Sequence, residues 1–262
     1  QARAAAELID IEYEVLEPVT DPFEAMAEGA PQIAPEGNVL SESAYTRGAA
    51  EAALASSAHV VSDSFKTAGI EHAYLEPESS LAVPQHGDGP RMHVLSQGQG
   101  AWEDRRQIAS LLGWEQQDVL VTQVATGGAF GGKEDLNVQG HAALLALAAD
   151  RPVLLALTRA DSLRFSIKRH RFWMEYTVGC DDDGMLTAVK ARFIGDNGGY
   201  ASVGAKVLER AAGHACSAYE VPNVDVKANA ILTNNPPCGA MRGFGANQAN
   251  FGMETLLDRL AE

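Results

Sequence analysis

A glycine-rich stretch, GGAFGGKE at residues 127–134, is the feature of this sequence that most directly predicts chemistry. Four of its first six positions are glycine, and it lies between a predicted strand and a predicted helix. Glycine lets the backbone approach a ligand closely, and the N-terminus of a helix carries a partial positive charge. The stretch therefore predicts a loop whose N–H groups face an anionic ligand, with a tight turn that binds nothing as the alternative.

Part of the same stretch resembles a nucleotide-binding P-loop. Gly127, Gly132 and Lys133 fit the spacing GxxxxGK. A P-loop has Ser or Thr at the next position to hold magnesium, whereas this sequence has Glu134, whose charge would face the phosphates. The pattern therefore argues against a P-loop. A P-loop-like nucleotide-binding protein stays as the alternative function, and a scaffold or assembly domain without catalytic activity is a third.

Three further positions are candidates for ligand contact. An irregular stretch rich in Pro and Gly, residues 234–248, contains the sequence RGF beginning at Arg242, which suits either a ligand-binding loop or a surface connector. Arg210 lies in an apolar, Ala-rich helical segment, where an arginine either reaches solvent or faces an anionic ligand. Gln97 stands at the end of a predicted strand, a common position for a ligand-facing side chain.

Hydrophobic periodicity predicts the elements that hold these positions. Strands are expected at residues 9–19, 59–67, 79–84, 92–96, 118–124, 153–158, 171–181, 185–196 and 224–232. Helices are expected at residues 1–8, in an Ala-rich segment from about 51, and at 102–113, 136–149, 205–214 and 249–262. Residues 21–50 are rich in Pro, Gly, Asn and Ser and predict a linker. Helices and strands intermix, so the predicted class is α+β with mixed sheets and packed helices.

Composition excludes several classes of partner. Lys and Arg number 20 against 35 Asp and Glu, and the resulting net charge of −15 repels nucleic acid and anionic membranes. No stretch reaches the roughly 18 consecutive apolar residues of a membrane helix. The 3 cysteines are far apart and form no CxxC, which argues against a disulfide framework or a zinc site and favours a cytoplasmic location.

Both ends of the sequence predict an internal piece of a longer protein. The first residue is Gln1, in a run that is typical of the end of a helix. The last, Glu262, lies in an apolar-periodic segment with no residue after it to end the helix.

Several motifs together resemble the molybdenum-binding subunit of the xanthine dehydrogenase and aldehyde oxidase family. The motifs, in the family's order and spacing, are EHAYLEPESSLAV, SQGQGAWEDRRQIASLLG, GGAFGGKE, RPVLLALTRADSLRFSIKRH, VLERAAGHACSAYEVPNV and GAMRGFGANQANFGME. The resemblance implies that residues 1–20 are the tail of a preceding hammerhead-like α/β domain. Residues 21–50 would then be the linker, and 51–262 a truncated first molybdopterin-binding domain.

The resemblance also implies roles for single residues. Those expected at the cofactor are Gln97, Gly128, Phe130, Gly131 and Arg242. Of these, Gln97, Phe130 and Arg242 would lie around the molybdenum without binding it directly. Glu134, Arg210 and Phe244 would contact the substrate, the first two by orienting a purine and the third by stacking on it. We therefore expect all these residues around one concave site, with the glycine loop and the Arg242 loop on facing walls.

The activity that the resemblance implies is hydroxylation of a purine or a related N-heterocycle, with oxygen taken from water. Gly243 stands where carbon monoxide dehydrogenases of the superfamily have a copper-binding cysteine, which argues against that reaction. The family's catalytic glutamate would lie beyond Glu262, so the 262-residue chain alone is expected to be inactive. The implied cofactors are molybdopterin with molybdenum, and 2Fe-2S clusters and FAD on partner subunits or segments. The remainder of the molybdenum subunit would be a further partner.

Overall fold

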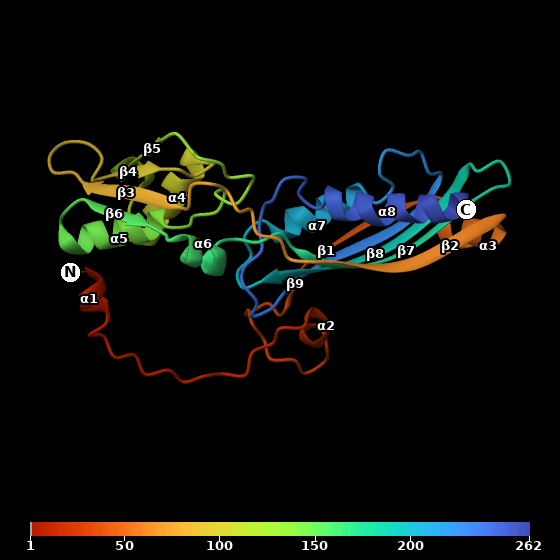
Figure 1. Cartoon of the computed structure of the whole chain (residues 1–262), viewed down its shortest axis with the longest axis horizontal. Helices are drawn as coiled ribbons and strands as arrows, with labels where there is room; N and C mark the ends of the chain where they lie inside the picture. The colour runs from red at the N-terminus through yellow and green to blue at the C-terminus, as the bar shows by residue number, and fades with distance from the viewer. Residues whose placement is uncertain (1) are drawn as a thin grey trace.

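The computed structural model describes residues 2–262, which form two mixed β-sheets of five and four strands. Figure 1 shows the smaller sheet and its helices at one end of an elongated molecule, and the larger sheet and its helices at the other. We call these two parts the small lobe and the large lobe. The predicted α+β class with mixed sheets and packed helices is confirmed.

The large lobe is built on the five-stranded sheet. Its strands, in spatial order, are β1 (Val39–Arg47), β9 (Asn223–Leu232), β8 (Leu186–Gly198), β7 (Arg171–Cys180) and β2 (His59–Thr67). β7 and β8 form the predicted hairpin, whose turn needs the left-handed backbone of Gly184 at φ +76°. The remaining elements of the lobe are α3 (Ala50–Ser56), α7 (Gly204–Gly213) and α8 (Ala246–Ala261).

Apolar residues from the sheet and the helices make one continuous core in the large lobe. α7 packs on β1 and β9, and α8 packs on β2 and β7. Val207, Leu208 and Ala211 recur at helical spacing on the buried face of α7 and belong to the same core as Phe193 and Met253. The other face of α7 carries Arg210 to the surface.

The small lobe has its own core. Its sheet contains β5 (Val119–Gln123), β4 (Met92–Ser96), β3 (Ser79–Pro84) and β6 (Val153–Ala156), and it packs on α4 (Ala101–Leu112) and α5 (Gln139–Ala149). A short 3-10 helix, η1, spans Gln116–Asp118. α4 ends as predicted at Gly113, whose φ of +67° suits the left-handed helix cap. The buried residues of this core include Met92, Ile108 and Ala142.

The structure corrects two predictions in the first 50 residues. The segment 9–19 is not a strand: no strand within residues 2–262 pairs with it, and Ile9, Ile11 and Val15 are 65%, 61% and 87% exposed. An alternating apolar segment forms a strand only where a neighbouring strand pairs with its backbone N–H and C=O groups. Within residues 2–262 no strand pairs with residues 9–19. The predicted linker 21–50 holds α2 (Pro22–Ala25) and all of β1, because β9 offers β1 a pairing edge.

Two helices complete the chain. α1 spans Ala2–Ala6, in the predicted position. α6 (Arg159–Phe165) was not predicted, although Thr158 and Asp161 form a capping box at its start, which is a signal for a helix N-terminus in the sequence. Among residues 2–262, no helix combines the length and the apolarity needed to cross a bilayer.

A buried histidine lies where the large lobe faces the small one. His170 precedes β7, is 1% exposed, and its Nε2 lies 2.9 Å from Oδ1 of Asn197. Burial lowers the pKa of His170 to about 4, since a charged ring would lose its hydration. The folded protein therefore holds this imidazole in its neutral form.

The core makes a first prediction about stability. Leu208→Ala removes a side chain that is 0% exposed, so the free energy of unfolding should fall by about 2–5 kcal/mol in urea denaturation. Leu145→Ala, at a helical leucine that is 51% exposed, is the matched control and should change it by less than about 1 kcal/mol. Equal effects of the two substitutions would contradict the assignment of this core.

His170 makes a prediction about pH. Between pH 6.5 and about 4 the unfolded chain takes up a proton at this residue and the folded chain does not, so stability falls as the pH falls. His170→Gln has no titratable group at this position but can still donate to Asn197. From pH 7 to pH 5, the free energy of unfolding of the wild type should fall by about 2 kcal/mol more than that of His170→Gln. Urea denaturation at both pH values measures this difference, and parallel losses would show that His170 does not resist protonation.

Candidate functional site

The glycine loop follows β5 and has an irregular backbone. Gly128, Phe130 and Gly131 have positive φ values of +90°, +52° and +102°. Tight turns close the loop, with the N–H of Gly132 donating to the Ala129 carbonyl at 2.8 Å. The predicted neighbouring helix starts later than expected, because α5 begins at Gln139. The helix N-terminus is therefore not directly beside the glycines.

The loop presents unused hydrogen-bond donors. Within residues 2–262 the backbone N–H groups of Gly128, Ala129 and Phe130 donate to no acceptor. The N–H of Gly131, which was also expected to face a ligand, instead donates to Oε1 of Gln99 at 3.0 Å. Consecutive free amides on a loop that alternates in handedness form an anion-binding concavity. Three amides of the loop fit this role, and the amide of Gly131 does not.

The glycine loop and the Arg242 loop meet directly. The N–H of Arg242 donates to the carbonyl of Phe130 at 2.9 Å. A Cβ atom at Gly131 would lie 2.7 Å from the carbonyl oxygen of Ala240, which is too close for any side chain. Two motifs more than 100 residues apart in sequence thus form one structure. Glycine at position 131 is required for that approach.

Buried side chains hold the Arg242 loop from behind. Arg169 donates from Nη2 to the Arg242 carbonyl at 2.8 Å, and Nε2 of His72 lies 2.8 Å from the Ala240 oxygen. Both residues are buried, and burial lowers the pKa of each. Nδ1 of His72 and Nη1 of Arg169 have no partner within residues 2–262, so burying them costs free energy that the contacts with the loop offset.

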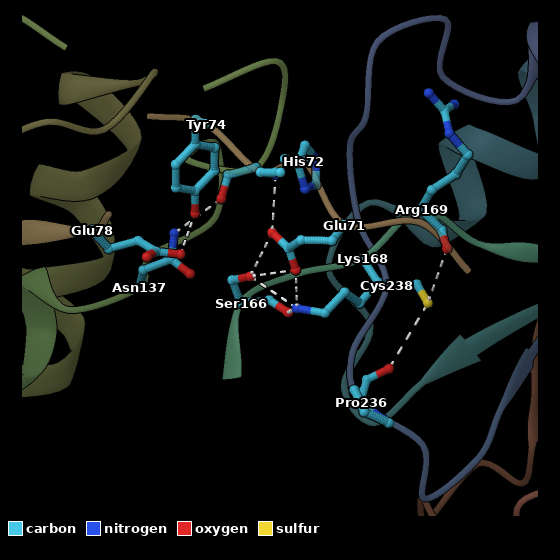
Figure 2. A network of polar contacts seen from close by, with 12 residues as sticks. Glu71, His72, Tyr74, Glu78, Asn137, Ser166, Lys168, Arg169, Pro236 and Cys238 are labelled. Carbon is cyan, nitrogen blue, oxygen red and sulfur yellow. Dashed lines mark hydrogen bonds and ion pairs between the residues drawn. The ribbon is translucent and has the colours of Figure 1, made fainter. Parts of the chain in front are cut away.

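A polar network joins the two lobes near these residues, as Figure 2 shows. Lys168 and Glu71 form an ion pair at 2.6 Å with side chains only 17% and 16% exposed, and Ser166 bonds to both. Breaking this half-buried pair would leave one partly desolvated charge without its partner. The network fixes the chain segment that carries His72 and Tyr74 against the segment that carries Arg169.

Gln97 lies at the end of β4, as predicted, and is 5% exposed. Its Oε1 accepts hydrogen bonds from Nζ of Lys133 at 3.0 Å and from the N–H of Ser79 at 3.2 Å. Lys133 is 2% exposed and also donates to the Glu76 carbonyl at 2.8 Å. A P-loop lysine has to reach phosphates, and this one is turned into the protein. The structure therefore gives no support to the nucleotide-binding alternative.

Arg210 and Phe244 lie together, although 33 residues separate them in the sequence. The guanidinium carbon of Arg210 is 5.2 Å from the centre of the Phe244 ring. Phe244 has a φ of +51°, and its N–H donates to the Met241 carbonyl in a turn at 2.7 Å. The aromatic ring and the cation are thus presented from the Arg242 loop and from the exposed face of α7.

Glu134 belongs to the glycine loop, and its N–H donates to the Gly131 carbonyl at 3.2 Å, but it lines a separate cavity. It lines a cavity of about 970 Å³ together with Asp135, His141, Tyr200 and Ser202, and none of the other predicted site residues lines this cavity. Burial raises the pKa of the Glu134 carboxyl, and the charge of Asp135 raises it further. Within residues 2–262 Glu134 and Arg210 form no ion pair, and Arg210 does not line this cavity.

Sequence reasoning missed four residues that build the site. His72 and Arg169 support the Arg242 loop, and Gln99 and Lys133 connect the end of β4 to the glycine loop. Gln99 and Lys133 carried a signal, because both are polar residues inside glycine-rich motifs. His72 and Arg169 carried none, since only the fold brings them to the Arg242 loop.

The chain is similar to parts of molybdenum enzymes. It is 36% identical over 260 residues to a probable xanthine dehydrogenase subunit of Bacillus subtilis, covering 99% of this chain and 35% of that protein. It is 37% identical to the nicotinate dehydrogenase large molybdopterin subunit of Eubacterium barkeri, covering 98% of this chain and 60% of that protein. The chain thus spans between one third and two thirds of the length of these relatives.

Solved structures agree with this family. The aldehyde oxidoreductase from Desulfovibrio gigas matches with a TM-score of 0.94 and 27% identity, over 99% of this chain and 29% of that one. The quinoline 2-oxidoreductase from Pseudomonas putida 86 matches with a TM-score of 0.90 and 28% identity, over 99% and 34% of the two chains. The model of the molybdopterin cofactor-binding domain matches residues 33–262. Because that match covers most of its length, the chain belongs to the molybdopterin cofactor-binding domain family.

Proposed function

We propose that this chain is part of a molybdenum hydroxylase that oxidises a nitrogen heterocycle, in the narrower case a purine, with oxygen taken from water. The observation that carries the proposal is the junction between the glycine loop and the Arg242 loop. There the hydrogen bond from Arg242 to Phe130 joins a row of free amides to an exposed arginine. Such a junction suits a cofactor that bears negative charge.

The residues at this junction fit a molybdenum-bearing pterin. Within the described residues, no group of three or more His, Cys, Asp or Glu side chains is placed to hold a metal ion. A molybdenum-bearing pterin would bring its metal with it, and the protein would supply binding and orientation. We propose that Gln97, Gly128, Phe130 and Arg242 face this cofactor. Gly131 contributes through the close approach of the two loops rather than through its N–H.

The substrate class is proposed from Arg210, Phe244 and Glu134. The ring of Phe244 can stack on a planar heterocycle, and Arg210 lies beside that ring. The names of two similar proteins also support a nitrogen heterocycle as the substrate. One is a nicotinate dehydrogenase and the other a quinoline 2-oxidoreductase, and both nicotinate and quinoline are nitrogen heterocycles. In the assembled enzyme, Glu134 would accept a hydrogen bond from a ring N–H.

When bound, the cofactor supplies oxidation of a ring carbon. The chain's own residues would orient the substrate and stabilise the charge that builds on it. Phe244 fixes the plane of the ring, which keeps the reacting carbon in line. Arg210 stabilises negative charge that develops on the heterocycle, and the effect is large where water is excluded.

Partner groups would carry the electrons away. Cys180, Cys216 and Cys238 are unpaired, and no metal-binding cluster includes them within residues 2–262. Iron–sulfur clusters need several cysteine ligands close together. We therefore propose that 2Fe-2S clusters and FAD belong to partner subunits or segments, and that the remainder of the molybdenum subunit completes the site.

The loop junction gives a prediction for the complete molybdenum subunit. Gly131→Ala places a Cβ 2.7 Å from the Ala240 oxygen and should separate the two loops, so that bound molybdenum falls at least about tenfold. Gly37→Ala is the matched control, because Gly37 has a similar φ of +97° but nothing within 4 Å of the added atom. Molybdenum analysis of the purified subunits measures the effect, and full occupancy in Gly131→Ala would rule out the junction as the cofactor site.

Arg210 gives a prediction for turnover. Arg210→Met should lower kcat/KM for the heterocyclic substrate by about 30- to 1,000-fold, the loss of about 2–4 kcal/mol of transition-state stabilisation, while molybdenum content stays unchanged. Lys206→Met, one turn earlier on α7 and paired on the surface with Glu209, is the control and should act like the wild type. Wild-type kcat/KM in Arg210→Met would remove Arg210 from the substrate site.

A further inference from the structure

Lys133 is a charged side chain buried at the back of the candidate site. Its Nζ donates to the Glu76 carbonyl at 2.8 Å and to Oε1 of Gln97 at 3.0 Å, and it lies 4.6 Å from the centre of the Tyr74 ring. Within residues 2–262 it forms no ion pair. All its close partners are neutral acceptors or a ring face, which is a costly way to bury an ammonium group.

The surroundings of this ammonium shift its pKa in opposite directions. Burial lowers the pKa of Lys133, and the nearby carboxylates of Glu76 and Glu78 oppose that shift. Glu78 is itself buried and accepts a hydrogen bond from the Tyr74 hydroxyl. The free space beside these groups is only about 10 Å³, the size of one water molecule. A phosphate group therefore does not fit beside Lys133, and the space holds at most one water molecule.

The contacts of Gln97 fix the orientation of its side-chain amide. Its Oε1 receives two donors, Nζ of Lys133 and the N–H of Ser79, and neither of these groups can accept a hydrogen bond. Turning the amide over would set its NH₂ group against both of them. The orientation is therefore fixed, and Nε2 points away from Lys133 without an acceptor within residues 2–262.

We infer that Lys133 is a positioning residue that makes Gln97 a hydrogen-bond donor toward the bound cofactor. The inference rests on the proposed function, which places the cofactor in front of Gln97. Without Lys133, only the longer hydrogen bond from the Ser79 N–H would hold the amide in this orientation. With Lys133, only N–H groups face the site, and the positive charge behind the amide strengthens them as donors.

The test compares Lys133→Met with Lys133→Arg in the complete molybdenum subunit with its cofactor. Lys133→Met should keep KM within about twofold, lower kcat by about 10- to 100-fold and change the EPR signal of the molybdenum in the partly reduced enzyme. Lys133→Arg keeps the positive charge and the N–H donors. Its kcat and its EPR signal should therefore lie closer to those of the wild type than those of Lys133→Met do. Lys190→Met, at a lysine paired on the surface with Glu51, is the control.

A second pair of variants needs no cofactor and covers the case in which Lys133→Met does not fold. In the present chain, Gln97→Met leaves the buried ammonium without its side-chain acceptor and should lower Tm. Gln97→Glu can still accept from Lys133 and should lower Tm less. In the complete subunit, Gln97→Glu should nonetheless change the EPR signal, because the donor is gone.

The outcomes separate the two proposals. A wild-type subunit without molybdenum would overturn both the proposed function and the inference. A wild-type subunit that contains molybdenum, with Lys133→Met or Gln97→Glu giving the wild-type kcat and EPR signal, would overturn the inference alone. A lower Tm for Gln97→Glu than for Gln97→Met would also count against it.

Discussion

Irregular backbone in the interior of a protein needs partners for its polar groups, and this requirement governs the Arg242 loop. No helix or strand covers residues 233–245, so their backbone groups need partners outside a regular element. Backbone N–H groups bind several of the carbonyls, whereas the side chains of Arg169 and His72 bind those of Arg242 and Ala240. The carbonyl of Phe130 in turn accepts the N–H of Arg242. The position of Arg242 is therefore decided by residues far from it in the sequence. A loop held in this way can offer a rigid surface to a ligand without belonging to a regular element.

The candidate site draws on both lobes. Gln97 and the glycine loop belong to the small lobe, whereas Arg210, Arg242 and Phe244 belong to the large lobe. Their geometry depends on how the lobes are joined, and the half-buried ion pair of Lys168 with Glu71 lies at that join. Buried charges of this kind add little net stability but favour one arrangement over others. The network in Figure 2 therefore acts on the precision of the site more than on the stability of the fold.

Local patterns predicted most of the regular elements and few of the contacts between them. The helix ending at Gly113 and the hairpin turning at Gly184 follow from local rules, and the structure confirms both. The strand expected at 9–19 is wrong, because pairing depends on a neighbour that a local pattern cannot reveal. Lys133 shows the same limit in the site. Its spacing suggested a phosphate ligand, and only the tertiary structure places its ammonium group against Gln97.

The order of the strands in the large sheet has a consequence for synthesis on the ribosome. β9 lies between β1 and β8, yet it is the last strand to be made. Until it emerges, β2, β7 and β8 can assemble by themselves, while β1 has no partner and keeps an open edge. The Arg242 loop follows β9 directly, so the cofactor cradle closes only when the sheet is complete. A nascent chain that stalls before residue 223 would therefore expose both an unpaired β1 and an unfinished cradle.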